Sequence, residues 1–250
     1  MTNKKDLSII TYDMSEFDRA KYLKKKYINI ITNTYSVKKN HTHDKTKGEV
    51  RKLLRQFAKE LNSFREYCDV GDTNINAFFS GNNLDESISK TVDVNVMFTV
   101  IFNLDAILKN AIKIEEHVDI KKDYNIKFIH EFLSILKVEN EEIIIIKITI
   151  KESRSSNTNN ILYSVTNLET IKKITSNLLS ASKSIDLGAQ SGSRLSNISL
   201  PLLISHVNNS DVLRYIPNEL LTADQIVIKE EGIKRYNEKK KYQISKKNSI

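Results

Sequence analysis

The sequence predicts an α+β fold, in which a helical N-terminal region packs on a mostly antiparallel sheet with flanking helices and a basic C-terminal tail. Apolar residues recur at helical spacing in the first 85 residues and alternate with a period of two in later segments, which is typical of strands. The order expected after residue 92 is strand, helix, helix, strand, strand, helix, which favours helices on one side of the sheet. We therefore predict three regions, residues 1–85, 86–228 and 229–250.

The composition is that of an ordinary globular protein. With 250 residues, 40% of them hydrophobic and 28% charged, the chain can bury a substantial core, and wholesale disorder is not expected. There is no run of 18 apolar residues and no secretory signal, and Cys68 is the only cysteine. We therefore expect an intracellular protein without membrane contact. Its wealth of Ile, Lys and Asn, which have A/T-rich codons, indicates an A/T-rich genome. A virus, phage or plasmid is our prior for the source of such a genome and is not inferred from any residue.

Two helices are expected in the N-terminal region. Ser15 can cap the first, which should run to about residue 31 because apolar residues continue at helical spacing. Thr46 and Glu49 form a T-x-x-E capping box before a long amphipathic segment, which predicts a second helix over residues 47–67. The segment between them has no apolar period and is predicted to be a loop.

The middle of the chain predicts strands and short helices. Residues 92–102 alternate as a long strand, Asn103 can cap a helix that reaches about residue 112, and apolar spacing predicts another helix over residues 127–137. Residues 143–151 and 161–166 read as an antiparallel hairpin with a long polar loop between them.

The rest of the chain alternates loops with short elements. Asn167 can cap a helix, and the Ser- and Gly-rich residues 182–197 predict a flexible loop. LPLLISHV and VLRYI fit either short strands or helical turns, and the basic segment from residue 229 should begin as a helix.

The histidines do not build a metal site on the sequence evidence. His41 and His43 form an H-x-H pair, but a zinc site needs three or four protein ligands. The remaining candidates form no ligand-spaced pair; they are Cys68, His117, His130 and His206. We therefore expect neither a metal nor a cofactor.

Enzymatic signatures are weak, and no catalytic residue is assigned. Asp93, Asp105 and the triplet Asp119-Ile120-Lys121 offer the residue types of a metal-dependent nuclease, but the triplet lies in a polar connector. The stretch GAQSGSR, residues 188–194, lacks the lysine of a phosphate-binding P-loop and fits a surface loop better.

The net charge of +8 raises the possibility of a nucleic-acid partner. Solvated lysines of an A/T-rich genome would give the same charge, and 31 lysines stand against eight arginines. The basic residues with the strongest claim to a nucleic-acid surface are Lys38, Lys39, Lys47, Arg51, Lys52, Arg55, Lys239, Lys240 and Lys241.

Three functional hypotheses follow in order of preference. The first is a non-enzymatic structural or assembly subunit of a larger complex, such as a virion or nucleoprotein component, with protein partners or self-assembly. The second is a nucleic-acid-binding protein that uses the basic residues above. The third is a metal-dependent nuclease.

Overall fold

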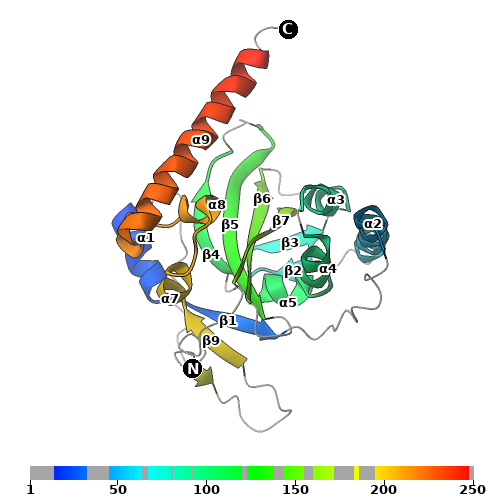
Figure 1. Cartoon of the computed structure of the whole chain (residues 1–250), viewed down its shortest axis with the longest axis horizontal. Coiled ribbons are helices and arrows are strands. Elements are labelled where there is room, and N and C mark those ends of the chain that lie inside the picture. Colours follow the sequence, from blue (N-terminus) through cyan, green and yellow to red (C-terminus); the bar gives the residue numbers. More distant parts are fainter. Residues whose placement is uncertain are drawn as a thin grey trace.

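The computed structural model describes residues 14–32, 45–63, 67–71, 73–79, 81–91, 93–119, 123–137, 143–154, 160–171, 183–185 and 195–247, and it has the predicted α+β fold (Figure 1). Its helices are α1 (Glu16–Lys24), α2 (Lys47–Ser63), α3 (Gly81–Lys90), α4 (Val94–Phe102), α5 (Leu104–Lys109), α7 (Leu200–Ile204), α8 (Ser210–Leu213), the 3-10 helix η3 (Asn218–Leu220) and α9 (Ala223–Lys247). Its strands are β1 (Tyr27–Thr32), β2 (Tyr67–Asp69), β3 (Asn76–Phe79), β4 (Ile112–His117), β5 (Ile126–Lys137), β6 (Ile143–Ser153), β7 (Asn160–Ile171), β8 (Lys183–Ile185) and β9 (Leu195–Ser199).

The sheet is mostly antiparallel, as predicted. Its strand order is β2-β3-β7-β6-β5-β1-β9-β8, and β4 also pairs with β5. The centre is the antiparallel run β4, β5, β6 and β7, which includes the predicted hairpin of β6 and β7. One edge of β5 serves two partners, because β4 pairs antiparallel with its middle and β1 pairs parallel with its last residues.

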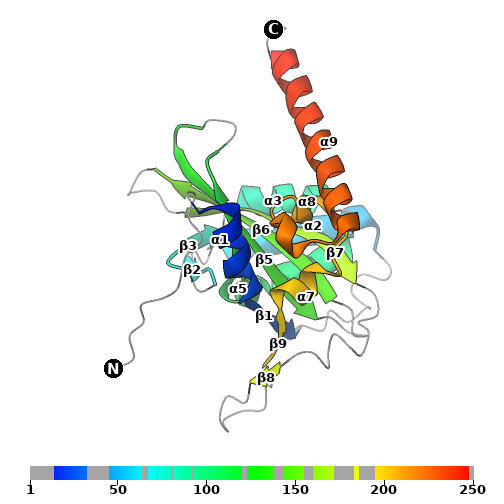
Figure 2. The ribbon, with the colours of Figure 1, turned by 90° about the vertical axis from the view of Figure 1, so that its left-hand side faces the viewer.

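Helices cover both faces of the sheet, so the expectation that they lie on one side was wrong. One core joins α2, α3, α4 and α5 to one face of β5 and β6. A second core joins α1, α7, α8 and the opposite face of the same strands (Figure 2). Strand β6 shows the division directly, because Ile144, Ile146 and Ile148 belong to the first core and Ile143 and Ile145 belong to the second.

The predicted caps of the N-terminal helices are confirmed. Ser15 Oγ accepts a hydrogen bond from Asp18 N at 3.1 Å, and Thr46 N donates to Glu49 Oε2 at 2.7 Å. The first helix is shorter than predicted, because it ends at Lys24 and residues 27–32 form β1. These residues are rich in Ile and pair with β9 and β5, so sheet formation outweighs the helical spacing.

Residues 94–102 form helix α4 and not the predicted strand. Val96 N donates to Asp93 Oδ1 at 3.1 Å, which caps the helix at its first turn. Val94, Met97 and Ile101 are buried and lie three and four residues apart, which is a helical period, whereas a strand would place Val94 on the opposite face from the other two. Helix α5 follows as predicted but ends at Lys109, and residues 112–117 form β4. The predicted cap is absent, because the Asn103 side chain makes no capping bond and donates to the Thr99 carbonyl at 2.7 Å.

Residues 127–137 belong to strand β5 and not to the predicted helix. Every residue from Ile129 to Leu136 is buried, because neighbouring strands and helices on both faces enclose the strand. Burial on both faces removes the period of two that would have identified a strand.

Three further expectations concern the later segments. Asn167 lies within β7, so it does not cap a helix before residue 171, and residues 172–182 lie outside the described part. The predicted loop over residues 182–197 contains β8 and the start of β9, and residues 186–194 lie outside the described part. LPLLISHV and VLRYI supply the helical turns α7 and α8, and the basic segment is helical within α9 as predicted.

Candidate functional site

Helix α9 is fixed to the body of the protein at its start. Thr222 and Gln225 form a capping box, in which Thr222 N donates to Gln225 Oε1 at 3.0 Å and Gln225 N donates to Thr222 Oγ1 at 3.3 Å. The Gln225 amide is buried and also donates to the carbonyl oxygens of Ile204 and Val207, each at 2.8 Å. These bonds join the first turn of α9 to the end of α7.

Lys229 and Gly232 continue the anchor one and two turns later. The buried Lys229 ammonium donates to the Ile216 carbonyl and to Asn218 Oδ1, each at 2.7 Å, and burial lowers its pKa. Gly232 approaches α8 so closely that an added Cβ would lie 2.5 Å from Ser210 Cβ. The packing of α9 therefore needs a residue without a side chain at this position.

The last described contact of α9 with the body is at Tyr236. The Arg214 guanidinium lies between two rings, 4.6 Å from the centroid of Tyr215 and 4.7 Å from that of Tyr236. Its Nη2 also donates to the Tyr215 hydroxyl at 2.5 Å. Four side chains are described beyond Tyr236, those of Asn237, Glu238, Lys239 and Lys241, and they make no hydrogen bond or ion pair with another element.

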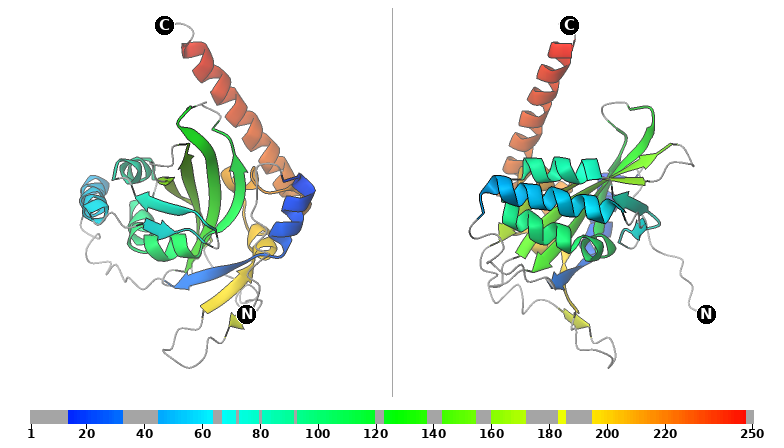
Figure 3. Two further views of the ribbon diagram at one scale, coloured as in Figure 1. Left: turned by 180° about the vertical axis from the view of Figure 1, so that it is seen from behind. Right: turned by 90° about the vertical axis from the view of Figure 1, so that its right-hand side faces the viewer.

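Residues 237–247 of α9, which we call the basic arm, project away from the body. Three views show the end of α9 standing beyond the layers of sheet and helices (Figures 1, 2 and 3). Asn237, Glu238, Lys239 and Lys241 are all exposed. The arm therefore offers its surface to a partner without any rearrangement of the core.

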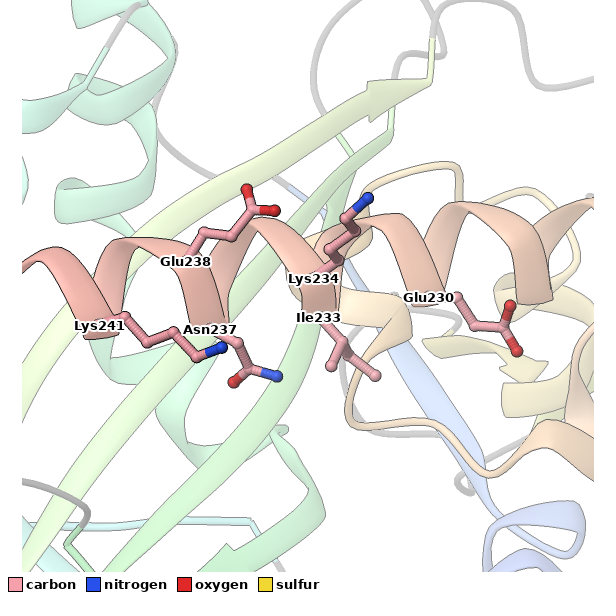
Figure 4. A pocket seen from close by; sticks show the side chains of 6 residues that line it. All are labelled: Glu230, Ile233, Lys234, Asn237, Glu238 and Lys241. Atoms are coloured by element: carbon pink, nitrogen blue, oxygen red, sulfur yellow. The ribbon is translucent and has the colours of Figure 1, made fainter.

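An open groove of about 460 Å³ follows one side of α9 from Glu230 to Lys241. Ile233, Asn237 and Lys241 lie along one edge, and Lys234 and Glu238 point the opposite way (Figure 4). All described lining residues belong to this one helix, and their charges alternate. A hollow this open, with all its described lining on one helix, is not the enclosed concave pocket in which small molecules bind.

The basic residues predicted on α2 lie in a different place. Figures 1 and 2 show α2 and α9 on opposite sides of the sheet. Arg51 Nη2 donates to the Thr91 carbonyl at 3.1 Å, and Arg55 pairs with Asp85 and donates to Ser89 Oγ at 2.9 Å. Both arginines thus hold α2 against α3 and its C-terminal connection. Lys47 and Lys52 are exposed, whereas Lys38, Lys39 and the side chain of Lys240 lie outside the described part.

The first of two buried polar clusters, the His130 cluster, lies on the face of the sheet that α2–α5 cover. It comprises the buried Lys113 and His130, the half-buried Glu116 and Glu152, and the exposed Lys127 at its edge. His130 Nε2 is 2.8 Å from Glu152 Oε2, its Nδ1 is 3.2 Å from Glu116 Oε2, and Lys113 pairs with Glu116. Burial, and next the charge of Lys113, lower the pKa of His130. The cluster is internally neutralised.

The second cluster, the Glu131 cluster, lies on the opposite face beneath α8. It comprises His117, Glu131, Lys147, Thr149 and Tyr215. Thr149 Oγ1 donates to Glu131 Oε2 at 2.8 Å, Lys147 Nζ is 3.4 Å from the same oxygen, and His117 Nε2 is 3.8 Å from Glu131 Oε1.

The pKa shifts in the Glu131 cluster favour the charged forms of the His117 and Glu131 pair. Burial opposes ionisation of Glu131, but His117, Lys147 and Thr149 together lower its pKa. Burial likewise opposes protonation of His117, but Glu131 and the Val118 carbonyl raise its pKa. For Lys147 burial prevails and lowers the pKa.

The two clusters contain the residue types of acid–base chemistry, but their geometry is that of internal ion pairs. His117 Nδ1 is engaged in a hydrogen bond to the Val118 carbonyl at 3.0 Å, so only Nε2 could exchange a proton with a substrate. Nε2 is covered from solvent. Glu131 is also buried. In the described arrangement, His117 Nε2 and the Glu131 carboxylate are therefore both covered by neighbouring groups.

The residues considered for a nuclease have separate structural roles. Asp93 caps α4, Asp105 pairs with Lys109 at 2.8 Å and Asp119 accepts a bond from Asp123 N at 3.2 Å. Among the described residues, no three His, Cys, Asp or Glu side chains are grouped to hold a metal ion. His41, His43, Lys121 and residues 188–194 lie outside the described part. Cys68 is buried, and burial with the Asp105 contact raises its pKa to about 12.

Sequence reasoning missed both polar clusters and the anchor of α9. The clusters depend on cross-strand pairs such as Glu116 with His130, which the helix predicted over residues 127–137 concealed. The T-x-x-Q pattern of Thr222 and Gln225 was available as a helix-start signal.

One part of the chain is similar to a known protein family. Residues 45–163 match the family model of large polyvalent protein-associated domain 3. The matched stretch runs from the approach to α2 into β7, so it includes the helices of the first core and the strands β2 to β6. Helices α7, α8 and α9 lie outside it. Searches of curated proteins and of solved structures find no match.

Within the described residues, no helix has both the length and the apolar character needed to cross a membrane. The 25-residue α9 is long enough, but its charged residues exclude it.

Proposed function

We propose that the protein is a non-enzymatic component of a larger assembly, to which it docks through the basic arm. The observation that carries this proposal is the geometry of α9, which is buried and hydrogen-bonded at Gln225 and Lys229 and whose residues 237–247 project from the body. The match to a domain associated with large polyvalent proteins is compatible with a phage-related role, such as that of a virion or nucleoprotein component.

The energetics of a projecting helix support a docking role. A helix without tertiary packing is marginal in water, because propensity alone barely offsets the cost of ordering the backbone. The three anchor points at the start of α9 hold a helical template in place, and a partner supplies contacts to its exposed distal side chains, which are Asn237, Glu238, Lys239 and Lys241 among those described. Ile233 and Tyr236, at the base of the arm, are 36% and 39% exposed and give that partner apolar surface.

The polar clusters support a non-enzymatic role. A catalytic carboxylate or imidazole has to reach its substrate, whereas Glu131 and His130 bond to other side chains of the same cluster. Their positions on the two packed faces of the sheet are consistent with a structural role, in which they fix the register of the strands and the position of α8.

Photochemical cross-linking in cells that make the protein naturally tests the proposal. Asn237, which lies in the groove, is replaced in the full chain by the photoreactive residue p-benzoylphenylalanine. The matched control carries the same residue in place of Lys59, which is exposed on α2 on the opposite side. We expect defined adducts from position 237 and none from position 59. Adducts from position 59 alone, or none from either position, would overturn the proposal.

A further inference from the structure

We infer that the partner of the basic arm is the phosphate backbone of a nucleic acid, bound without regard to base sequence. This inference rests on the proposed docking role of the arm and names the chemistry of what it docks on. It assigns binding to α9 and not to the basic side of α2.

Charge is segregated along α9. Its acidic residues are Asp224, Glu230, Glu231 and Glu238, which all precede residue 239. Residues 239–250 contain five lysines and no acidic residue, whereas the whole chain has a net charge of +8. Residues 239–247 thus carry five positive charges and no negative one on the part of the molecule that projects from the body. A gathered charge is the electrostatic footprint that phosphate binding requires.

The positions of the lysines favour a partner that surrounds the helix. Successive residues of an α-helix lie about 100° apart around its axis, so the exposed Lys239 and Lys241 lie about 200° apart, on nearly opposite sides of the helix. A flat acidic protein surface would meet only one of them. The major groove of a duplex, or a wrapped single strand, carries phosphates on both sides of a helix that lies within it.

Helix stabilisation does not account for these lysines. Cations near the C-terminus of a helix interact favourably with its dipole, and that explains Lys246 and Lys247 in the last turn of α9. The dipole effect falls off within one turn. Lys239, Lys240 and Lys241 lie about two turns earlier, so the dipole leaves them unexplained.

The choice of lysine over arginine defines the kind of recognition. Lysine acts as a flexible point charge on phosphate, whereas arginine reads base edges through two parallel hydrogen bonds. The arm beyond Tyr236 contains no arginine. We therefore expect contacts that fix the protein on the backbone and carry no sequence information.

The test measures binding of the full chain to fluorescein-labelled DNA duplexes and RNA strands of two unrelated sequences by fluorescence anisotropy. If four phosphates are contacted, affinity should fall on the order of 100-fold between about 50 and about 200 mM salt. The arm variant Lys239→Glu, Lys240→Glu, Lys241→Glu should lose at least about tenfold in affinity at the lower salt. The two sequences of each nucleic acid should bind equally.

The matched control is Lys47→Glu, Lys52→Glu, Lys59→Glu on α2, which changes the net charge by the same amount at exposed positions. Circular dichroism and thermal unfolding establish that both variants are folded. The control should retain affinity within about twofold. Equal losses in both variants, loss in the control alone, or no binding by the unaltered protein would each overturn the inference.

Competition with polyglutamate separates nucleic acid from an acidic protein. We expect polyglutamate to compete far less well than unlabelled DNA at equal charge, and equal or better competition would overturn the inference. The two proposals can fail separately. If position 237 cross-links to a protein, and either the arm variant binds DNA normally or the unaltered protein binds no DNA, the nucleic-acid assignment is wrong. The docking role of the arm would still stand.

Discussion

The Cβ that Gly232 lacks would lie 2.5 Å from the Cβ of Ser210, a separation that real side chains do not tolerate. Ser210 begins α8, so α9 packs directly against α8 at this point. Because Arg214 of the same segment reaches Tyr236 one turn further along α9, the direction of the basic arm is set by this contact.

Gly232→Ala should destabilise the protein. Overpacking costs about 1–3 kcal/mol, and the gain in helix propensity returns about 1 kcal/mol. The expected net loss is about 1 kcal/mol, or about 2–4 °C in thermal unfolding followed by circular dichroism. Gly48→Ala is the matched control, because its nearest atom would be Thr46 Oγ1 at 3.9 Å. An equal rise in stability in both variants would contradict the close contact.

Glu131→Gln should destabilise the protein more than the loss of one surface ion pair. Lys147 would be left buried without its carboxylate, for which the cost is roughly 3 kcal/mol. Lys147→Met in the same chain removes the uncompensated charge, so the double variant should lose less than the sum of the single losses. Urea unfolding measures the free energy of unfolding of the two single variants and the double variant. The control is Lys109→Gln, which breaks an exposed ion pair and should leave the stability of the unaltered protein measurably unchanged. Additive losses would show that the two residues are not coupled.

His117 should stabilise the fold more at acidic than at alkaline pH. Burial works against protonation, but the neighbouring Glu131 and the Val118 carbonyl raise the pKa of His117 above its ordinary 6.5. Its contribution is therefore fully present below pH 6.5 and is lost as the pH rises through the folded-state pKa. His117→Gln should cost more stability near pH 6 than near pH 9 in urea unfolding. A cost that does not change with pH would contradict the raised pKa.

His130 should show the opposite dependence. Burial, followed by the Lys113 charge, lowers its pKa below 6.5, so the unfolded chain takes up a proton before the folded one. The folded protein should lose stability as the pH falls below 6.5. His130→Gln should lose less over the same range, and comparison above about pH 5 keeps Glu152 ionised in both proteins. Direct titration of the His130 ring by NMR gives a second reading, and a pKa above 6.5 would refute the expectation.

The sequence predicted helices best where local chemistry decides them. The capping boxes and caps at Ser15 and Thr46 involve residues three apart, so no knowledge of the fold is needed to find them. Strand β6 and its hairpin partner were also predicted, because an unbroken isoleucine run favours a buried strand.

The errors arose where tertiary contacts decide between two periods. Residues 94–102 fit alternation and a helix equally well, and the helix prevails because Asp93 caps it and Phe102 stacks on Phe57 of α2 at 3.9 Å. Strand β5 is enclosed on both faces, so its pattern of burial does not alternate. The predicted nucleic-acid surface combined basic residues of α2 with those of the C-terminal tail. The structure shows α2 and α9 on opposite sides of the sheet, a separation that the sequence does not reveal.

A chain that ends at Tyr236 should fold as well as the full chain. The side chains described beyond Tyr236 make no bond to another element. Removal of residues 237–250 therefore leaves the anchor at Gln225, Lys229 and Gly232 intact. We expect thermal unfolding within about 2 °C of the full chain. The same truncation should abolish docking and nucleic-acid binding.

A chain that ends at Lys229 provides the contrast. It lacks the Tyr236 ring that stacks on Arg214, a contact worth about 0.5–2 kcal/mol, so it should unfold at a lower temperature than the chain that ends at Tyr236. If the two truncated chains were equally stable, the Arg214 contact would not hold α9. If the longer one were much less stable than the full chain, the arm would belong to the fold, and its projection from the body would need another explanation.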